Sequence, residues 1–182
     1  MRRDTLAAPL DRVLFGQQVI AERVAELGHS ISVDHAPQVP VLVTILRGGV
    51  VFLADLCRAI EIDVELDFMA VTPYGSPLAD GAVRILKDLD TVIEGRRVIV
   101  VEDIIDTGLT LNYLLRVLRQ RSPESIEVCV LLDKDVRRIV DLPLTYRGFS
   151  VPDRFLVGYG LDFRGEYRNL PYVATLRDEV WS

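Results

Sequence analysis

A short acidic segment near the middle of the chain carries the side chains best suited to chemistry. In the string VIVVEDIIDTGLT (residues 98–110), Glu102 and Asp103 directly follow four apolar residues. Carboxylates at the end of a buried strand are costly unless a cation or a hydroxyl group meets them. If the strand continues through them, their side chains point to opposite sides, so one can face a ligand and the other a metal ion, a lysine or a hydroxyl. The pattern predicts a binding site at the end of this strand.

The turn that follows has the composition of a phosphate-binding loop. It reads Asp106, Thr107, Gly108, Leu109, Thr110 and leads into an apolar helical pattern. Backbone amides, two threonine hydroxyls and a helix N-terminus all favour a dianionic phosphate, and a glycine lets the backbone approach it closely. The alternative is that Asp106 or Thr107 only caps the helix, as in any such turn. The spacing of this turn alone leaves both interpretations open.

The segments around this turn alternate between expected strands and expected helices. Unbroken β-branched runs such as VPVLVTIL are typical of strands in a parallel sheet that is covered on both faces. Such alternation predicts an α/β fold with a mainly parallel twisted sheet flanked by helices. The expected strands are 39–46, 64–71, 83–89, 98–101 and 126–132, the expected helices are 11–27, 50–60 and 107–121, and a long mobile loop is expected over 72–82.

Ligands of parallel sheets bind beyond the carboxyl ends of the strands. This rule selects three places in the chain: Arg47-Gly48-Gly49, the 102–110 segment, and Asp133-Lys134. From the sequence alone, the two glycines are only a strand-to-helix turn and Lys134 is an ordinary solvated lysine. Their place in the expected sheet makes them candidate ligand contacts.

Composition and charge narrow the class of protein. The 182 residues, 49% of them hydrophobic and 26% charged, favour one domain of ordinary size. The formal net charge of -6 argues against a nucleic-acid partner. Cys57 and Cys129 lie in apolar runs without metal-ligand spacing, which indicates free thiols in a reducing compartment. The polar start is unlike a signal peptide and no apolar run could span a membrane, so we expect a cytoplasmic protein without a membrane partner.

The full 98–110 string resembles the motif with which type I phosphoribosyltransferases bind 5-phosphoribosyl 1-pyrophosphate (PRPP). Further matches resemble the hypoxanthine-guanine branch of that family; they include LRGG (46–49), DFM (67–69), ILKDL (85–89), LLDK (131–134) and VPDRFLVGYGLD (151–162). The resemblance implies one domain over residues 1–182. Its α/β core would cover about 11–135, and a small hood about 136–182 together with the N-terminus.

The resemblance also implies roles at the sheet edge. Glu102 and Asp103 would hold the ribose hydroxyls, directly or through Mg²⁺, and the 106–110 loop would bind the 5-phosphate. Asp106 would lie near purine N7 as the general acid/base. Arg47 and Gly48 match the pyrophosphate loop, where main-chain amides and an unusual cis peptide meet the leaving group. The family more often has lysine at position 47, which arginine can replace because the main chain does the binding.

The remaining roles concern the base and the lid. Lys134 would donate to the purine 6-oxo group, Phe155 would stack on the base, and Leu156 would offer backbone groups to its edge. Asp162 resembles a second metal ligand and Arg168 a pyrophosphate contact. Tyr74 lies in the expected lid, where the family usually has Ser-Tyr and this chain has Pro-Tyr.

The implied activity is purine salvage: Mg²⁺-dependent transfer of the 5-phosphoribosyl group from PRPP to N9 of hypoxanthine or guanine, giving IMP or GMP and pyrophosphate. A xanthine-preferring enzyme is one alternative, whereas Lys134 and the 155–162 segment argue against a pyrimidine. Another alternative is a PRPP-sensing regulator, which needs the phosphate loop but not an acid/base residue, a lid and a pyrophosphate loop together. The resemblance also implies a homodimer or homotetramer.

Overall fold

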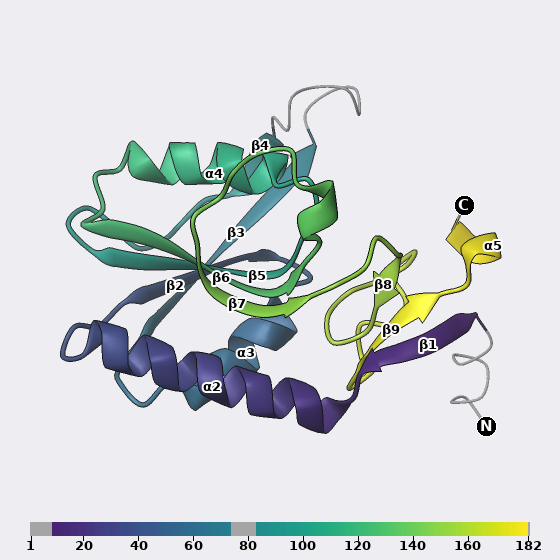
Figure 1. The fold of residues 1–182 in the computed structure, drawn as a ribbon. Coiled ribbons are helices and arrows are strands. Elements are labelled where there is room, and N and C mark those ends of the chain that lie inside the picture. Colours follow the sequence, from purple (N-terminus) through teal and green to yellow (C-terminus); the bar gives the residue numbers. More distant parts are fainter. Residues whose placement is uncertain (1–8, 74–82, 182) are drawn as a thin grey trace.

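The computed structural model describes residues 9–73 and 83–181, which form two β-sheets and their covering helices (Figure 1). The larger sheet has six strands in the order β4-β3-β2-β5-β6-β7. Only β4 runs antiparallel to its neighbour. The strands are β2 (Val41–Leu46), β3 (Glu65–Pro73), β4 (Val83–Lys87), β5 (Arg97–Ile105), β6 (Ser125–Asp133) and β7 (Leu144–Ser150). The expected α/β fold with a mainly parallel sheet is confirmed.

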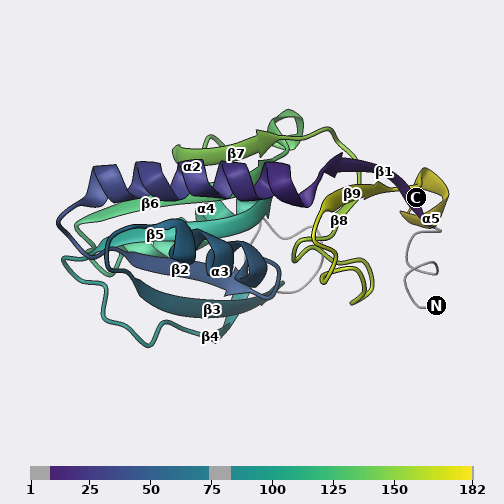
Figure 2. The same cartoon turned by 90° about the horizontal axis from the view of Figure 1, so that it is seen from below.

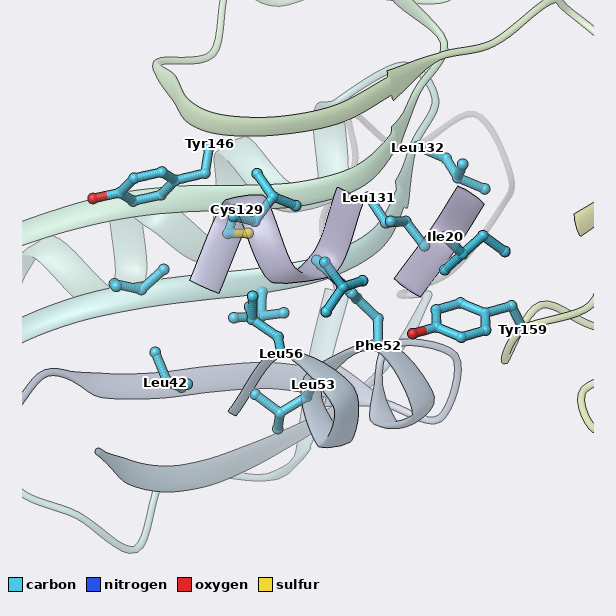
Figure 3. Packing of buried hydrophobic residues seen from close by; sticks show 14 of the residues in the cluster. Ile20, Leu42, Phe52, Leu53, Leu56, Cys129, Leu131, Leu132, Tyr146 and Tyr159 are labelled. Atoms are coloured by element: carbon cyan, nitrogen blue, oxygen red, sulfur yellow. The ribbon is translucent and has the colours of Figure 1, made fainter. Parts of the chain in front are cut away.

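Helices cover both faces of this sheet (Figure 1). On one face lie α2 (Gln17–His35) and α3 (Val50–Ala59), and on the other α4 (Leu109–Arg119). Neighbouring residues along β5 point to opposite faces of the sheet. Ile99 packs with side chains of α2 and α3, whereas Val100 packs with side chains of α4. Figure 3 shows the first of these cores, in which Phe52 and Leu56 of α3 meet side chains of α2 and the sheet. Burial on both faces explains why the strands read as continuous apolar runs.

A smaller three-stranded sheet lies beyond one end of the larger one (Figure 2). It consists of β1 (Leu10–Phe15), β9 (Val173–Leu176) and β8 (Leu156–Val157), and α5 (Asp178–Trp181) follows β9. We call β1 together with residues 151–181 the hood. The larger sheet continues past residue 135, where the core was expected to end, because β7 supplies its edge strand after a short 3₁₀ turn, η1 (Asp135–Arg137).

The first expected helix was wrong at both ends. Residues 10–15 form β1, which pairs antiparallel with β9, and the helix begins only at Gln17 and continues to His35. It does not stop at Gly28, because that glycine is where α2 packs on α3: a Cβ there would lie 2.6 Å from the backbone of Ala59. The glycine is a close-packing position rather than a helix end.

The central strand is longer than expected. β5 pairs with β6 as far as Ile105 opposite Asp133, whereas the sequence predicted a strand over 98–101. This extension keeps Glu102 and Asp103 within the sheet. Within the described part of the chain, no helix is long and apolar enough to cross a membrane.

Candidate active site

Two adjacent carboxylates lie at the carboxyl edge of the larger sheet. Because β5 continues through Glu102 and Asp103, their side chains point to opposite faces, as expected. Asp103 is buried, and its Oδ1 accepts a hydrogen bond from the backbone N–H of Ile104 at 2.8 Å. Both carboxylates border the same cavity, together with the turn that follows the strand.

Burial penalises the charge on these two groups. It raises the pKa of Asp103 to about 6, although the backbone amides of Ile104 and Asp103 itself and the charge of Arg168 act in the opposite direction. Burial, and then the neighbouring charge of Asp103, raise the pKa of Glu102 well above its ordinary value. A bound cation or hydroxyl donors would stabilise the charged form of such buried carboxylates, so this pair is a candidate binding site for them.

The turn after β2 lies directly against Asp103. The peptide bond between Leu46 and Arg47 is cis, and Gly48 follows it. A Cβ on Gly48 would overlap Oδ2 of Asp103, so only glycine allows the carboxylate and this backbone to lie so close together. The cis peptide expected from the family resemblance is present at the expected place.

The turn after β5 forms the second wall. Gly108 adopts a positive φ of 79° and precedes α4, where a Cβ would lie 2.8 Å from Leu142. The backbone N–H of Leu109 donates to Oγ1 of Thr107 over a long 3.4 Å. Thr107, Gly108 and Thr110 border the cavity that Glu102 and Asp103 also line, whereas Leu109 does not appear in its wall.

Asp106 does not cap α4. The N-cap residue is Gly108, and the long bond from Leu109 at this terminus goes to Thr107 rather than to Asp106. Instead, Oδ1 of Asp106 lies 3.1 Å from Nε of Arg137, in the turn after β6. The carboxylate therefore lies at the ligand-facing edge of the sheet, beside Arg137.

Lys134 is buried rather than solvated. It directly follows β6 with only 7% of its surface exposed, and its backbone N–H donates to Ile105. Its Nζ lies 3.8 Å from Oδ1 of Asp153, a carboxylate that Nη1 of Arg137 also approaches at 3.3 Å. The ammonium is therefore held at the edge of the cavity by a partly exposed acid.

The hood supplies the remaining candidate residues. Leu156 begins β8 and Phe155 directly precedes it; the Phe155 ring packs edge-on against Phe163 at a centroid distance of 5.3 Å. Asp162 is held by two donors: Nη2 of Arg168 at 2.6 Å and the backbone N–H of Gly165 at 2.8 Å. The expected metal ligand and the expected pyrophosphate contact are thus ion-paired to each other.

Two neighbouring cavities collect these side chains. The loop cavity, about 320 Å³, lies between the turns after β2 and β5; its walls include Arg47, Gly48, Glu102, Asp103, Asp106, Thr107, Gly108 and Thr110. The hood cavity, about 570 Å³, is bordered by Gly48, Asp103, Asp106, Lys134, Arg137, Asp153, Phe155, Leu156, Asp162, Arg168 and Trp181, among others. Gly48, Asp103 and Asp106 line both. Of the residues predicted from the sequence, Tyr74 lies outside the described residues.

The carboxylates of the two cavities suit Mg²⁺ better than a metal ion that is bound by protein side chains alone. This ion prefers oxygen ligands and usually takes one or two carboxylates together with substrate phosphates and water. Among residues 9–73 and 83–181, no three His, Cys, Asp or Glu side chains converge into a cage. Glu102, Asp103 and Asp162 offer oxygens along the two cavities. They fit a magnesium ion that a bound substrate helps to hold.

Comparisons with known proteins agree with this geometry. A family model described as "Phosphoribosyl transferase domain" matches residues 15–164. The chain is 44% identical over 178 residues to a hypoxanthine-guanine phosphoribosyltransferase of Streptococcus thermophilus (strain CNRZ 1066), covering 97% of this chain and 99% of that one. The chain belongs to the phosphoribosyltransferase family.

Solved structures of this phosphoribosyltransferase family share the fold over nearly the full length. A crystal structure of a hypoxanthine phosphoribosyltransferase from Staphylococcus aureus has a TM-score of 0.94 at 40% identity, covering 98% of this chain and 97% of that one. A hypoxanthine-guanine phosphoribosyltransferase from Bacillus anthracis has a TM-score of 0.89 at 43% identity, covering 92% and 99%. The expectation of a purine-salvage phosphoribosyltransferase is confirmed at this level.

Several residues that line the hood cavity were not predicted from the sequence, and some of them carry a charge or an aromatic ring that could contact a ligand. Arg137, Asp153 and Trp181 all line the hood cavity. A signal for Arg137 was present, because the run DKDVRR after a buried strand gathers charge at the ligand-facing edge. Trp181 gave no such signal, since it reaches the cavity only because α5 folds back beside Phe155, with ring centroids 5.9 Å apart.

Proposed function

We propose that the chain transfers the 5-phosphoribosyl group from PRPP to N9 of hypoxanthine or guanine, with Mg²⁺, to give IMP or GMP and pyrophosphate. The observation that carries this proposal is that Asp103 and Asp106 border both cavities. A sugar lying at that junction can have its phosphate in one cavity and its base in the other. The site is thus suited to a substrate with a phosphate, a ribose and a planar ring in sequence.

The loop cavity is suited to the phosphate groups. The 106–110 turn offers backbone amides, two hydroxyls and the N-terminus of α4, which together favour a dianion. Arg47 and Gly48 offer a cation and main-chain amides on the facing wall. Magnesium, when bound, neutralises charge on the departing pyrophosphate. Glu102 and Asp103 hold the ribose hydroxyls and stabilise positive charge that develops on the sugar.

The hood cavity is suited to a 6-oxopurine. Phe155 offers an aromatic face for stacking, and backbone groups of Leu156 meet the base edge. Lys134, as an ammonium, donates hydrogen bonds but accepts none, so it favours an oxo group and disfavours an amino group at purine position 6. Asp106 exchanges the proton at N7.

A steady-state assay with PRPP, Mg²⁺ and a panel of four bases tests this proposal. We expect turnover of hypoxanthine and guanine, with adenine disfavoured by at least about 100-fold in kcat/KM. Preferred turnover of xanthine would move the chain to the xanthine branch. Tight binding of PRPP without turnover of any base would identify a sensor and overturn the proposed activity.

Two further expectations accompany the proposal. We infer that the protein works in the cytoplasm and assembles as a homodimer or homotetramer. Light scattering coupled to size-exclusion chromatography measures the assembly directly, and a monomer at micromolar concentration would contradict it.

A further inference from the structure

A tight turn of the hood around Gly160 contacts the loop after β2. Gly160 adopts a φ of 100°, and a Cβ at this position would overlap the carbonyl oxygen of Gly48. Gly48 in turn lies against the carboxylate of Asp103. The hood turn therefore meets the loop backbone to backbone, and the other side of the loop meets the Asp103 carboxylate, so neither contact leaves room for a Cβ.

Tyr159, next to Gly160, joins this turn by a hydrogen bond to α3, the helix that follows the loop. Tyr159 is 7% exposed, and its hydroxyl donates a hydrogen bond to Oδ2 of Asp55 at 2.6 Å. Asp55 lies in α3, which begins at Val50 directly after the loop. The hood turn is thus joined to the loop itself through Gly160 and to the following helix through Tyr159.

The backbone of Tyr159 needs this anchor. Its φ is 49°, a conformation that a non-glycine residue keeps only where its surroundings determine it. Its backbone N–H donates to the carbonyl oxygen of Leu170 at 2.9 Å, and the phenol is the attachment on the other side. Burial and the bond to Asp55 raise the pKa of Tyr159, so the phenol stays protonated as a donor.

The same turn holds Arg168. The backbone N–H of Gly160 donates to the carbonyl oxygen of Arg168 at 3.0 Å, and Nη1 of Arg168 donates back to the carbonyl oxygen of Gly160 at 2.6 Å. The turn therefore contacts Gly48, which borders both cavities, and Arg168, which resembles a pyrophosphate contact and borders the hood cavity. Lys134 lies instead in the turn after β6, outside this set of contacts.

We propose that Tyr159 is a positioning residue for the pyrophosphate end of the site: its hydrogen bond to Asp55 holds Gly160 against Gly48 and sets the position of Arg168. This inference rests on the proposed function, because it assigns the effect to PRPP and pyrophosphate. The groups proposed to hold the purine base, Lys134, Phe155 and Leu156, share no hydrogen bond with Tyr159, which bonds to Asp55 and Leu170.

The first test is Tyr159→Phe, which keeps the ring and removes the hydroxyl. The carboxylate left behind is 40% exposed and ion-paired with Arg58, so no buried charge is stranded. We expect the KM for PRPP and the Kd for magnesium pyrophosphate to rise roughly threefold to tenfold, as for the loss of one hydrogen bond. The KM for hypoxanthine should stay within about twofold, because the lost bond joins Tyr159 to Asp55 and involves none of the groups proposed to hold the base.

A pair of glycine variants separates contact from backbone strain. Gly160→Ala and Gly95→Ala both place a side chain at positive φ, 100° and 67°, but only the former meets another atom. We expect both to lower the melting temperature, whereas only Gly160→Ala weakens pyrophosphate binding. A double-mutant cycle adds a second readout, because Asp55→Ala should weaken pyrophosphate binding little further when Tyr159→Phe is already present. In the chain that keeps Tyr159, Asp55→Asn still offers an acceptor to the hydroxyl and should retain most of the affinity that Asp55→Ala loses.

The outcomes are distinguishable. If Tyr159→Phe leaves the PRPP KM and the pyrophosphate Kd unchanged, or weakens base and PRPP equally, the positioning role is overturned while the proposed function stands. If the wild type turns over no base, the proposed function fails, and calorimetry with magnesium pyrophosphate still decides whether Tyr159 and Gly160 control that end of the site. Should Tyr159→Phe not fold, the Gly160 and Asp55 variants give the decision.

Discussion

Neutralising Asp103 should stabilise the unliganded chain while removing its function. The pKa of this carboxyl is raised by burial from 3.8 to about 6, so the folded state holds its proton more tightly than the unfolded state does. Well below pH 3.8 the group is protonated in both states. As the pH rises from about 4 to about 6, the unfolded chain ionises this acid while the folded chain still holds its proton, and stability is lost until the folded chain ionises as well. About two pKa units correspond to roughly 3 kcal/mol, an order-of-magnitude figure that is fully expressed above pH 6.

Asp103→Asn removes this penalty and keeps an acceptor for the backbone N–H of Ile104. At pH 7.5, with metal removed by a chelator, the variant should be about 1–3 kcal/mol more stable than the wild type. For a chain of this size that corresponds to a melting temperature about 3–10 °C higher. Urea unfolding at a series of pH values between 4 and 8 measures the difference, which should shrink towards zero at the acid end.

Asp67→Asn is the matched control, because Asp67 is another buried acid of the larger sheet but has the opposite shift. Burial pushes its pKa up, but backbone amides of Thr91 and Phe68 and the charge of Lys87 outweigh that effect and lower it. This control should lose stability at pH 7.5. Two results would refute the reasoning. One is a difference in unfolding free energy between wild type and Asp103→Asn that does not change with pH, and the other is an Asp103→Asn variant that is less stable than wild type at pH 7.5.

Three predictions concern activity. Asp106→Asn keeps the shape of the side chain but not its basicity, so the single-turnover rate constant should fall at least about tenfold while the KM for PRPP stays nearly unchanged. An unaltered single-turnover rate constant would remove the acid/base role. Lys134→Met should lower kcat/KM for hypoxanthine and guanine by about 10- to 100-fold, the value of a charge-assisted hydrogen bond, and narrow the gap to adenine; equal losses for all three bases would contradict it. Gly48→Ala drives a methyl group into Asp103, so calorimetry should find pyrophosphate binding weaker by at least about tenfold, with the circular dichroism spectrum unchanged; retained affinity would show that the loop does not bind through its backbone.

The sequence allowed the centre of the site to be predicted because its determinants are local. Glu102 to Thr110 run from the end of one strand through a turn to the first residues of α4, so the order of apolar, acidic and hydroxyl residues nearly specifies their relative positions. The strands of the larger sheet were recognisable for a similar reason, since burial on both faces leaves long β-branched runs.

Features that depend on distant partners could not be predicted. Residues 11–15 belong to a segment with helical apolar spacing, yet they form part of β1 because β9, more than 150 residues away, offers a free edge. Gly28 resembles a helix end, yet α2 runs through it because Ala59 of α3 packs there. Trp181 joins the hood cavity only through the fold of the C-terminal segment. Periodicity carries no information about such contacts.

The position of Trp181 makes the chain its own optical reporter. It is the single tryptophan in the sequence, and its indole borders the hood cavity beside Phe155. All tryptophan emission therefore comes from one place, the wall against which a planar base would lie. A base entering the cavity changes the surroundings of that indole, so stopped-flow fluorescence can time the binding of unlabelled bases separately from their conversion.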